Sequence, residues 1–272
     1  MTTLNYVLLF SAGIGAGIIN TVAGGGSVLT LPALIFCGIP PGAANATNRI
    51  GVIAQNITAI RQFRNNGISE WPLTWRLMLV GVFGSVLGAQ LATYIPDAKF
   101  EKLLGVLMLG LLPLTLIKPR KAPQPSSIST ASDAAVNETL NPSRDYWAPL
   151  TPRMQWVSLV TFFALGIYGG FLQAGIGIMI LIASDHLLRV GLKNANYLKL
   201  VFILAVTVWA FALFVIKGVN IAWIAGVVVT CGQIIGAWMG SWVAIKKGEK
   251  LIRAFMVVSI LLSSAKLLGF FG

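Results

Sequence analysis

The residues with the clearest chemical potential lie in two glycine-rich breaks, each beside a carboxamide. Asn20 precedes Ala23-Gly-Gly-Gly-Ser27, and Gln173 precedes Ala174-Gly-Ile-Gly177. Consecutive glycines are poor helix formers, so each break predicts a helix end, a tight turn and a new helix start, which Ser27 can cap. A helix that starts inside a membrane points free N–H groups and its positive dipole end at the space before it, which suits a small anion. The candidate substrate-binding residues here are Asn20, Gly24, Gly25, Gly26, Ser27, Gln173, Gly175 and Gly177. The alternative is a surface loop, or close helix packing by small residues.

Two later apolar runs open with asparagines and each carries one cation. Arg49 and Lys199 lie about six residues into their runs, or about 9 Å deep at the helical rise. Intramembrane cations are costly, so they predict a function, here the attraction of an anion. The alternative is that both side chains extend to the lipid headgroups. The candidates from these runs are Asn45, Asn48, Arg49, Asn196 and Lys199.

Asp185 and His186 end a short apolar run and form the remaining ionisable pair of interest. Such a pair can relay a proton, which makes these residues candidates for proton coupling. The alternative is a solvated, structural pair at the membrane interface.

The elements that position these residues follow from composition. The chain of 272 residues is 56% hydrophobic and 10% charged, against roughly 25% charged in a soluble domain. Most of its surface must therefore face lipid. The net charge of +12 does not indicate nucleic-acid binding, because the cations lie in short gaps between apolar runs, where they set membrane orientation.

Ten apolar runs divide into two groups of five. Eight are long enough to span a bilayer as helix, whereas 28–38 and 176–188 are short and either span or re-enter. Between the groups lies a Pro/Ser-rich stretch that predicts an aqueous linker. We expect an N-terminal transmembrane repeat (1–117), a cytoplasmic linker (118–152) and a C-terminal transmembrane repeat (153–272).

The two groups resemble each other in the order of their features: glycine break, short run, asparagine-rich start, and a later Gly-x-x-x-Gly pair. If each repeat crosses the membrane an odd number of times, fifteen of the 20 cations fall on one side, in the gaps at 61–76, 118–153, 189–199 and 246–253. If only the long runs cross, the bias disappears. The positive-inside rule favours the odd count, with both termini periplasmic. The second repeat is then inverted relative to the first, as in secondary transporters. The predicted fold is an all-α polytopic membrane protein of two inverted repeats.

Other chemistry is not indicated. The sequence has no nucleophile–base–acid set and no ATPase, metalloprotease or dinucleotide motif, so we expect neither an enzyme nor a cofactor. One histidine and two separated cysteines do not predict a metal site. A secondary carrier or a channel remains.

The segment from Gly13 to Leu34, GIGAGIINTVAGGGSVLTLPAL, together with Ala44-Asn-Ala-Thr-Asn-Arg49, resembles the TauE/SafE sulfite exporter family, also called the TSUP family. The second-half copy, Gly169-Gly-Phe-Leu-Gln-Ala-Gly-Ile-Gly177, departs from the family's fuller glycine cluster. The resemblance implies a bacterial plasma (inner) membrane protein that transports sulfite, organosulfonates or related small carboxylates.

The sequence and the resemblance together predict a secondary transporter, an exporter, that moves a small anion by alternating access. A passive anion channel and a non-transporting structural membrane subunit are the alternatives. The expected partners are the small anion and the lipid bilayer; proton coupling and assembly as a homodimer stay open.

Overall fold

The structure, a computed structural model, describes residues 1–67, 71–116, 147, 150–188, 190 and 192–246. Every regular element in these residues is a helix, which confirms the predicted fold class at the level of an all-helical chain. Most of the linker and the last apolar run, 251–271, lie outside the described residues.

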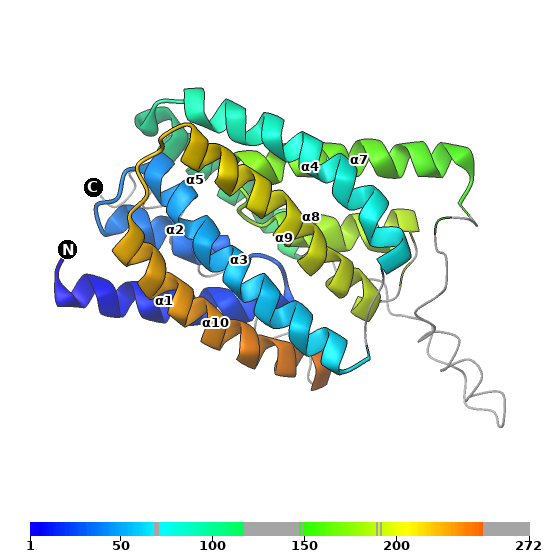
Figure 1. Cartoon of the computed structure of the whole chain (residues 1–272), viewed down its shortest axis with the longest axis horizontal. Coiled ribbons are helices and arrows are strands. Elements are labelled where there is room, and N and C mark those ends of the chain that lie inside the picture. Colours follow the sequence, from blue (N-terminus) through cyan, green and yellow to red (C-terminus); the bar gives the residue numbers. More distant parts are fainter. Residues whose placement is uncertain (68–70, 117–146, 148–149, 189, 191, 247–272) are drawn as a thin grey trace.

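Each of the nine apolar runs within the described residues corresponds to a helix, and the run 176–188 divides into α8 and a π-helical turn. In chain order the helices are α1 (Thr3–Val22), α2 (Ser27–Phe36), α3 (Pro41–Asn65), α4 (Trp71–Tyr94), α5 (Asp97–Leu116), α7 (Pro152–Phe171), α8 (Ile176–Ala183), the π-helical turn η1 (Ser184–Leu188), α9 (Leu192–Ile216) and α10 (Trp223–Lys246) (Figure 1).

Five helices in the described part are long and apolar enough to cross a membrane: α1, α4, α7, α9 and α10. The sequence predicts eight long runs, of which one lies outside the described residues. The other two, α3 and α5, are less apolar for separate reasons. α3 has 25 residues but a row of buried amides and Arg49 along it, and α5 begins with charged residues, including Asp97, Lys99 and Glu101.

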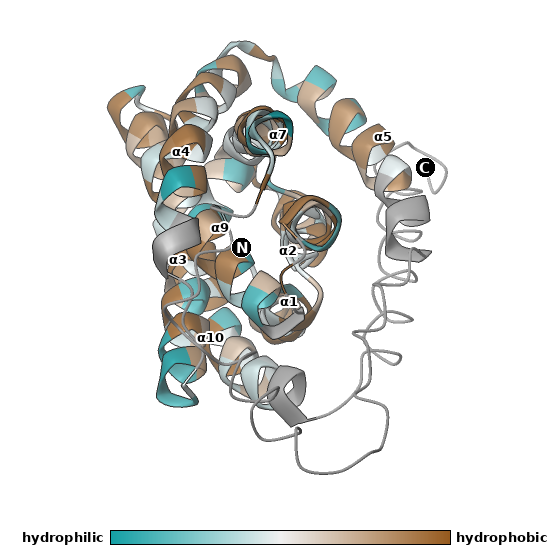
Figure 2. Ribbon diagram, turned by 90° about the vertical axis from the view of Figure 1, so that its right-hand side faces the viewer, coloured by the Kyte–Doolittle hydropathy of each residue, from teal (hydrophilic) through white to brown (hydrophobic). Residues whose placement is uncertain are grey.

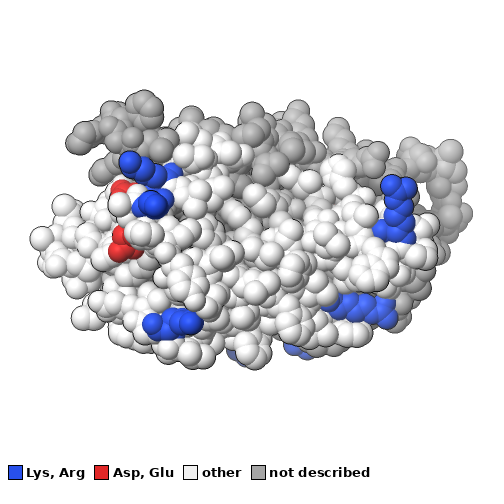
Figure 3. Space-filling view, turned by 90° about the horizontal axis from the view of Figure 1, so that it is seen from above, with Lys and Arg blue, Asp and Glu red and all other residues white. Residues whose placement is uncertain are grey.

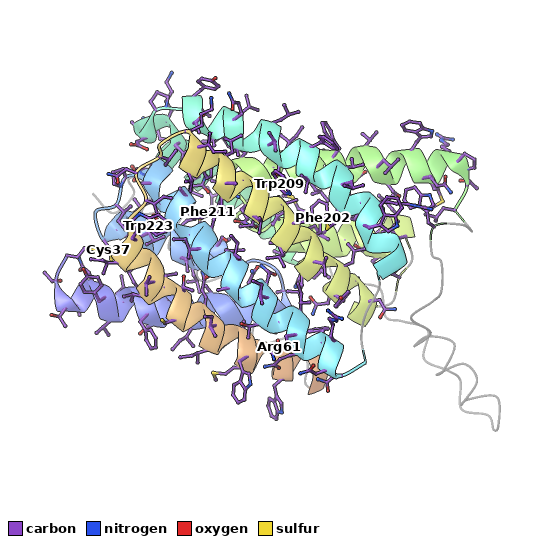
Figure 4. All side chains as sticks on the ribbon, viewed as in Figure 1. Cys37, Arg61, Phe202, Trp209, Phe211 and Trp223 are labelled. Carbon is purple, nitrogen blue, oxygen red and sulfur yellow. The ribbon has the colours of Figure 1, made fainter. Side chains whose placement is uncertain are left out.

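The surface suits a bilayer. Large apolar side chains stand exposed along the helices, including Phe83 at 69%, Trp156 at 69% and Ile224 at 69%, and hydrophobic residues dominate the ribbons (Figure 2). The charged side chains visible in Figure 3 gather toward the two ends of the long axis, with a largely uncharged belt between them. Cys37 lies just before the start of α3 and Arg61 lies near the other end of that helix (Figure 4). A belt of this kind is what lipid requires of a transmembrane surface.

Helices of the two halves pack against one another rather than only among themselves. α1 lies along α10, and α7 lies along α4 (Figure 1). Glycines permit both approaches: a Cβ added at Gly17 would lie 2.7 Å from the Ala237 backbone nitrogen, and one at Gly84 would lie 2.9 Å from that of Ile167. Small residues at four-residue spacing allow such close contact in membranes.

α1 and α7 run in opposite directions along the long axis, since α1 begins at the left of Figure 1, where N is marked, and α7 begins at the right. The packing also matches α1 with α7 and α10 with α4. In each pair of contacts, α1 with α10 and α7 with α4, a helix of one half packs along the matching partner from the other half. The division into repeats at 1–117 and 153–272 stays a prediction.

Candidate functional site

Each half contains a helix that breaks and restarts, and the two breaks have the same local geometry. The N–H of Gly24 bonds to Ile19 O at 3.0 Å, and the N–H of Gln173 bonds to Tyr168 O at 3.2 Å, so each closes the end of its helix. Both residues are left-handed, with φ of 83° at Gly24 and 67° at Gln173. This is a common way for a helix to end, and glycine is the usual residue there.

This geometry corrects one part of the sequence interpretation. The sequence pairs Asn20 with Gln173 as matching carboxamides, whereas the structure places Gln173 where the first half has Gly24. Ser27 is also not a helix cap. It is the first residue of α2, Gly26 is the N-cap, and no side chain caps this helix end. The Ser27 hydroxyl instead accepts a hydrogen bond from Asn48.

The two breaks meet in direct backbone contact. The N–H of Gly177 donates to Gly24 O at 3.0 Å. All the candidate residues of the two breaks are buried: Asn20, Gly24, Gly25, Gly26, Ser27, Gln173, Gly175 and Gly177. The contact leaves no room for a side chain, because a Cβ on Gly177 would lie 2.7 Å from Gly24 O. The breaks are therefore closed to solvent in this arrangement.

The last carbonyls of α7 accept hydrogen bonds from α3. Arg49 donates to Gly169 O at 3.1 Å and to Gly170 O at 2.6 Å, and Asn45 donates to Phe171 O at 2.8 Å. The guanidinium also lies 4.9 Å from the ring centroid of Phe214. The C-terminal end of a helix carries partial negative charge, so a cation and an amide here stabilise the interrupted helix.

The last carbonyls of α1 accept hydrogen bonds from α9 in the same way. Lys199 donates to Asn20 O and Thr21 O, both at 3.0 Å. Each half thus supplies the cation for the broken helix of the other half. Neither Arg49 nor Lys199 reaches the headgroups, since both side chains are fully buried.

The buried polar and charged residues that the structure describes include no Asp or Glu. Asp185 and His186 do not lie at the breaks. They belong to η1 at the far end of α8, about ten residues from Gly175 and so about 15 Å away along the helix. His186 is exposed, and its Nδ1 lies 3.0 Å from Ile182 O.

A polar network beside the first break links α2, α3 and α10. Asn48 donates to Ser27 Oγ at 3.1 Å, and its Oδ1 accepts from Thr30 Oγ1 at 2.6 Å and from Gln233 Nε2 at 3.3 Å. All four side chains are at most 4% exposed. A buried network of this density is expected to hold one defined geometry.

The structure adds residues that the sequence interpretation missed. Thr30 joins the network beside the first break. Thr207 accepts from the Gln173 amide, and the Tyr168 hydroxyl donates to Ala174 O at 2.5 Å. Thr30 follows Ser27 by three positions and so shares its helix face, a signal that could have identified it. Nothing local in the sequence marks Thr207. Asn196 is buried with its Oδ1 unpartnered in the described part of the chain.

Interrupted helices, buried cations and a lipid-facing surface together define a class: a polytopic membrane protein with a polar centre. Comparison with known proteins then identifies the family. The family model described as "Sulfite exporter TauE/SafE" matches residues 9–267. The chain belongs to this family, and it is accordingly a multi-pass membrane transporter rather than an enzyme.

Curated relatives agree over nearly the full length. A "Probable membrane transporter protein" of Haemophilus influenzae is 28% identical over 96% of this chain and 93% of its own length. The "Probable membrane transporter protein YfcA" of Escherichia coli K12 is 28% identical over 96% and 88%. The "Probable membrane transporter protein ORF9" of a Sinorhizobium species is 26% identical over 96% and 91%. No solved structure matches the chain significantly.

Proposed function

We propose that the protein is a secondary transporter that exports a small anion, such as sulfite, an organosulfonate or a small carboxylate, across the bacterial inner membrane. One observation carries the choice of an anion: the Arg49 side chain is fully buried, its hydrogen bonds go to the neutral backbone carbonyls of Gly169 and Gly170, and its Nε has no partner among the described residues. A buried cation is expensive unless an opposite charge offsets it, and an anion between the breaks would supply that charge.

The dipoles of the interrupted helices also favour a negatively charged solute. Each break brings together a helix C-terminus, with about half a negative charge, and a helix N-terminus, with about half a positive charge. The carbonyl ends of α1 and α7 are already bonded to Lys199 and Arg49. The N-terminal end of α2, where the N–H groups of Gly25, Gly26 and Ser27 donate to no described residue, is the part left to attract a solute, and it favours a negative one.

Alternating access follows from the way the halves are joined. In the closed arrangement the Gly177–Gly24 hydrogen bond seals the centre, so a passing solute requires the two breaks to separate. An inverted repeat offers two equivalent ways to open, one toward each side of the membrane. The linker would face the cytoplasm, and the termini would face the periplasm.

Proton coupling through Asp185 and His186 belongs to the same proposal. Their place at the far end of α8 suits a proton gate at one membrane face rather than a residue that contacts the anion. An Asp185→Asn variant should then lose uphill transport driven by a pH gradient while it keeps exchange of anion down its own gradient.

The decisive experiment uses the full chain in proteoliposomes loaded with sulfite, sulfoacetate or acetate in turn. A carrier gives saturable flux that a proton gradient or a counter-anion gradient drives uphill. Flux that neither saturates nor moves uphill would assign a channel instead, and absence of flux for every anion would contradict the proposal. Arg49→Ala with unchanged kinetics for each accepted anion would remove that residue from the mechanism.

A further inference from the structure

The polar network beside the first break carries more hydrogen-bond donors than the described residues accept from. Asn48 Oδ1 already accepts two bonds, from Thr30 and Gln233, and Ser27 Oγ accepts one from Asn48. In the part of the chain that the structure describes, the Ser27 hydroxyl donates to nothing, and Asn48 Nδ2 and Gln233 Nε2 each use one of their two N–H groups. Three buried protons therefore lack an acceptor among the described residues, an arrangement that native proteins avoid unless water or a ligand supplies one.

Gln233 contributes a donor to the network from a third helix. Its amide nitrogen lies 3.3 Å from Asn48 Oδ1 and donates to it. Gln233 Oε1 itself has no partner among the described residues. Gln233 is fully buried, and it reaches the network from α10, whereas Ser27 and Asn48 belong to α2 and α3.

The backbone adds donors at the same place. The N–H groups of Val28 and Leu29 bond to Gly25 O and Gly26 O. The N–H groups of Gly25, Gly26 and Ser27 donate no hydrogen bond to a described residue. Successive unpaired N–H groups at a helix start form an anion-binding concavity.

The second break lacks this chemistry. Ile176 opens α8 as Ser27 opens α2, and Met179 and Leu198 stand where Thr30 and Asn48 would be, since Lys199 corresponds to Arg49. Ile176 packs in an apolar cluster. The backbone scaffold is thus repeated, but at these three positions hydroxyl and amide side chains occur at the first break only.

We propose that one oxoanion per chain binds at the start of α2, to one side of the contact between the breaks, with Ser27, Asn48 and Gln233 as its side-chain donors. Thr30 is a positioning residue that orients Asn48. This inference rests on the proposed function and specifies its binding site. Because Gln233 comes from α10, the bound anion ties the second half to α2 and α3.

Binding of sulfite and of sulfoacetate to the purified full chain in detergent, measured by calorimetry, tests the site. The wild type should bind about one anion per chain. Gln233→Leu and Asn48→Ala should each raise the Kd about tenfold or more, the loss expected for one hydrogen bond to a charged group. Thr30→Val should raise the Kd, and Thr30→Ser should restore it because the hydroxyl is retained.

Two matched controls separate this site from a general loss of structure. Met179→Leu occupies the corresponding position of α8, and Ser85→Ala removes a buried hydroxyl that donates to Val206 O; both should leave the Kd unchanged. Wild-type binding that survives Gln233→Leu and Asn48→Ala would overturn the location while leaving anion transport intact. Two anions per chain would overturn the one-sided site. No binding of either anion, together with no anion flux in proteoliposomes, would overturn the proposed function and this inference with it.

Discussion

A single methyl group at Gly177 tests whether the two breaks touch in the membrane. Gly177 lies in the first turn of α8 with ordinary helical backbone, so alanine causes no strain there. Its Cβ would lie 2.7 Å from Gly24 O and 2.9 Å from Gly24 C. Both atoms belong to backbone that cannot rotate away, so the breaks must move apart.

The expected magnitude combines two effects. Separation breaks the Gly177–Gly24 hydrogen bond, which contributes about 1 kcal/mol. Overpacking of a tight contact costs about 1–3 kcal/mol more. The gain in helix propensity from glycine to alanine, about 1 kcal/mol, opposes them. We expect Gly177→Ala to be about 1–3 kcal/mol less stable than the wild type and to transport more slowly, since the closed arrangement is disfavoured.

Thermal unfolding in detergent and flux in proteoliposomes measure the two expectations. Gly110→Ala is the control, because a Cβ at Gly110 meets nothing within 4 Å and the substitution should be neutral or slightly stabilising. If Gly177→Ala matches Gly110→Ala in both Tm and flux, the breaks are not in contact in the working protein, and the argument from the closed centre fails.

Substitutions at three further positions test two contacts of the site and the packing of α1 on α10. Arg49→Ala removes two hydrogen bonds to α7 carbonyls and should lower the free energy of unfolding by about 3 kcal/mol. Arg49→Lys should lower it by about half as much. If both variants unfold as the wild type does, neither charge nor geometry matters at this position. Gln173→Gly removes the strain of a left-handed backbone at a non-glycine residue, which stabilises the fold by about 1 kcal/mol, but it also loses the hydrogen bond to Thr207. The Tm should therefore stay close to that of the wild type while anion flux falls. Unchanged flux would remove the Gln173 amide from the pathway. Gly17→Leu forces a side chain into α10, where a Cβ already lies 2.7 Å from Ala237 N, and should destabilise the fold by about 3 kcal/mol in chemical unfolding; a wild-type curve would mean that α1 and α10 are not packed this closely.

The lengths of the apolar runs were sufficient to predict the helices. Lipid requires long apolar runs, and glycine and proline end them, so the bounds of α1, α3 and α9 follow closely from composition. The low hydropathy of α3 has a physical reason: neighbouring helices cover this helix, so it tolerates Asn48, Arg49 and Asn56. High hydropathy is required of a helix that faces lipid, whereas a helix surrounded by other helices can carry polar side chains that bond to them.

The candidate site was predictable in its residue types but not in its contacts. Intramembrane Arg49 and Lys199 stand out in any apolar sequence. Their partners are backbone carbonyls of helices more than a hundred residues away, Gly169 and Asn20 among them, and carbonyls have no signature in a sequence. The equivalence of Gln173 with Gly24 is hidden for a similar reason, because it depends on φ rather than on side-chain type.

The exchange of cations between halves gives the transport cycle a physical constraint. Arg49 of the first half holds the end of α7, and Lys199 of the second half holds the end of α1. A rocking motion that pulled α3 from α7 or α9 from α1 would leave a buried cation facing apolar side chains, at a cost of several kcal/mol. These pairs should therefore move as units, α3 with α7 and α9 with α1. The uncharged contact between Gly24 and Gly177 is the cheaper one to break, so opening should begin there.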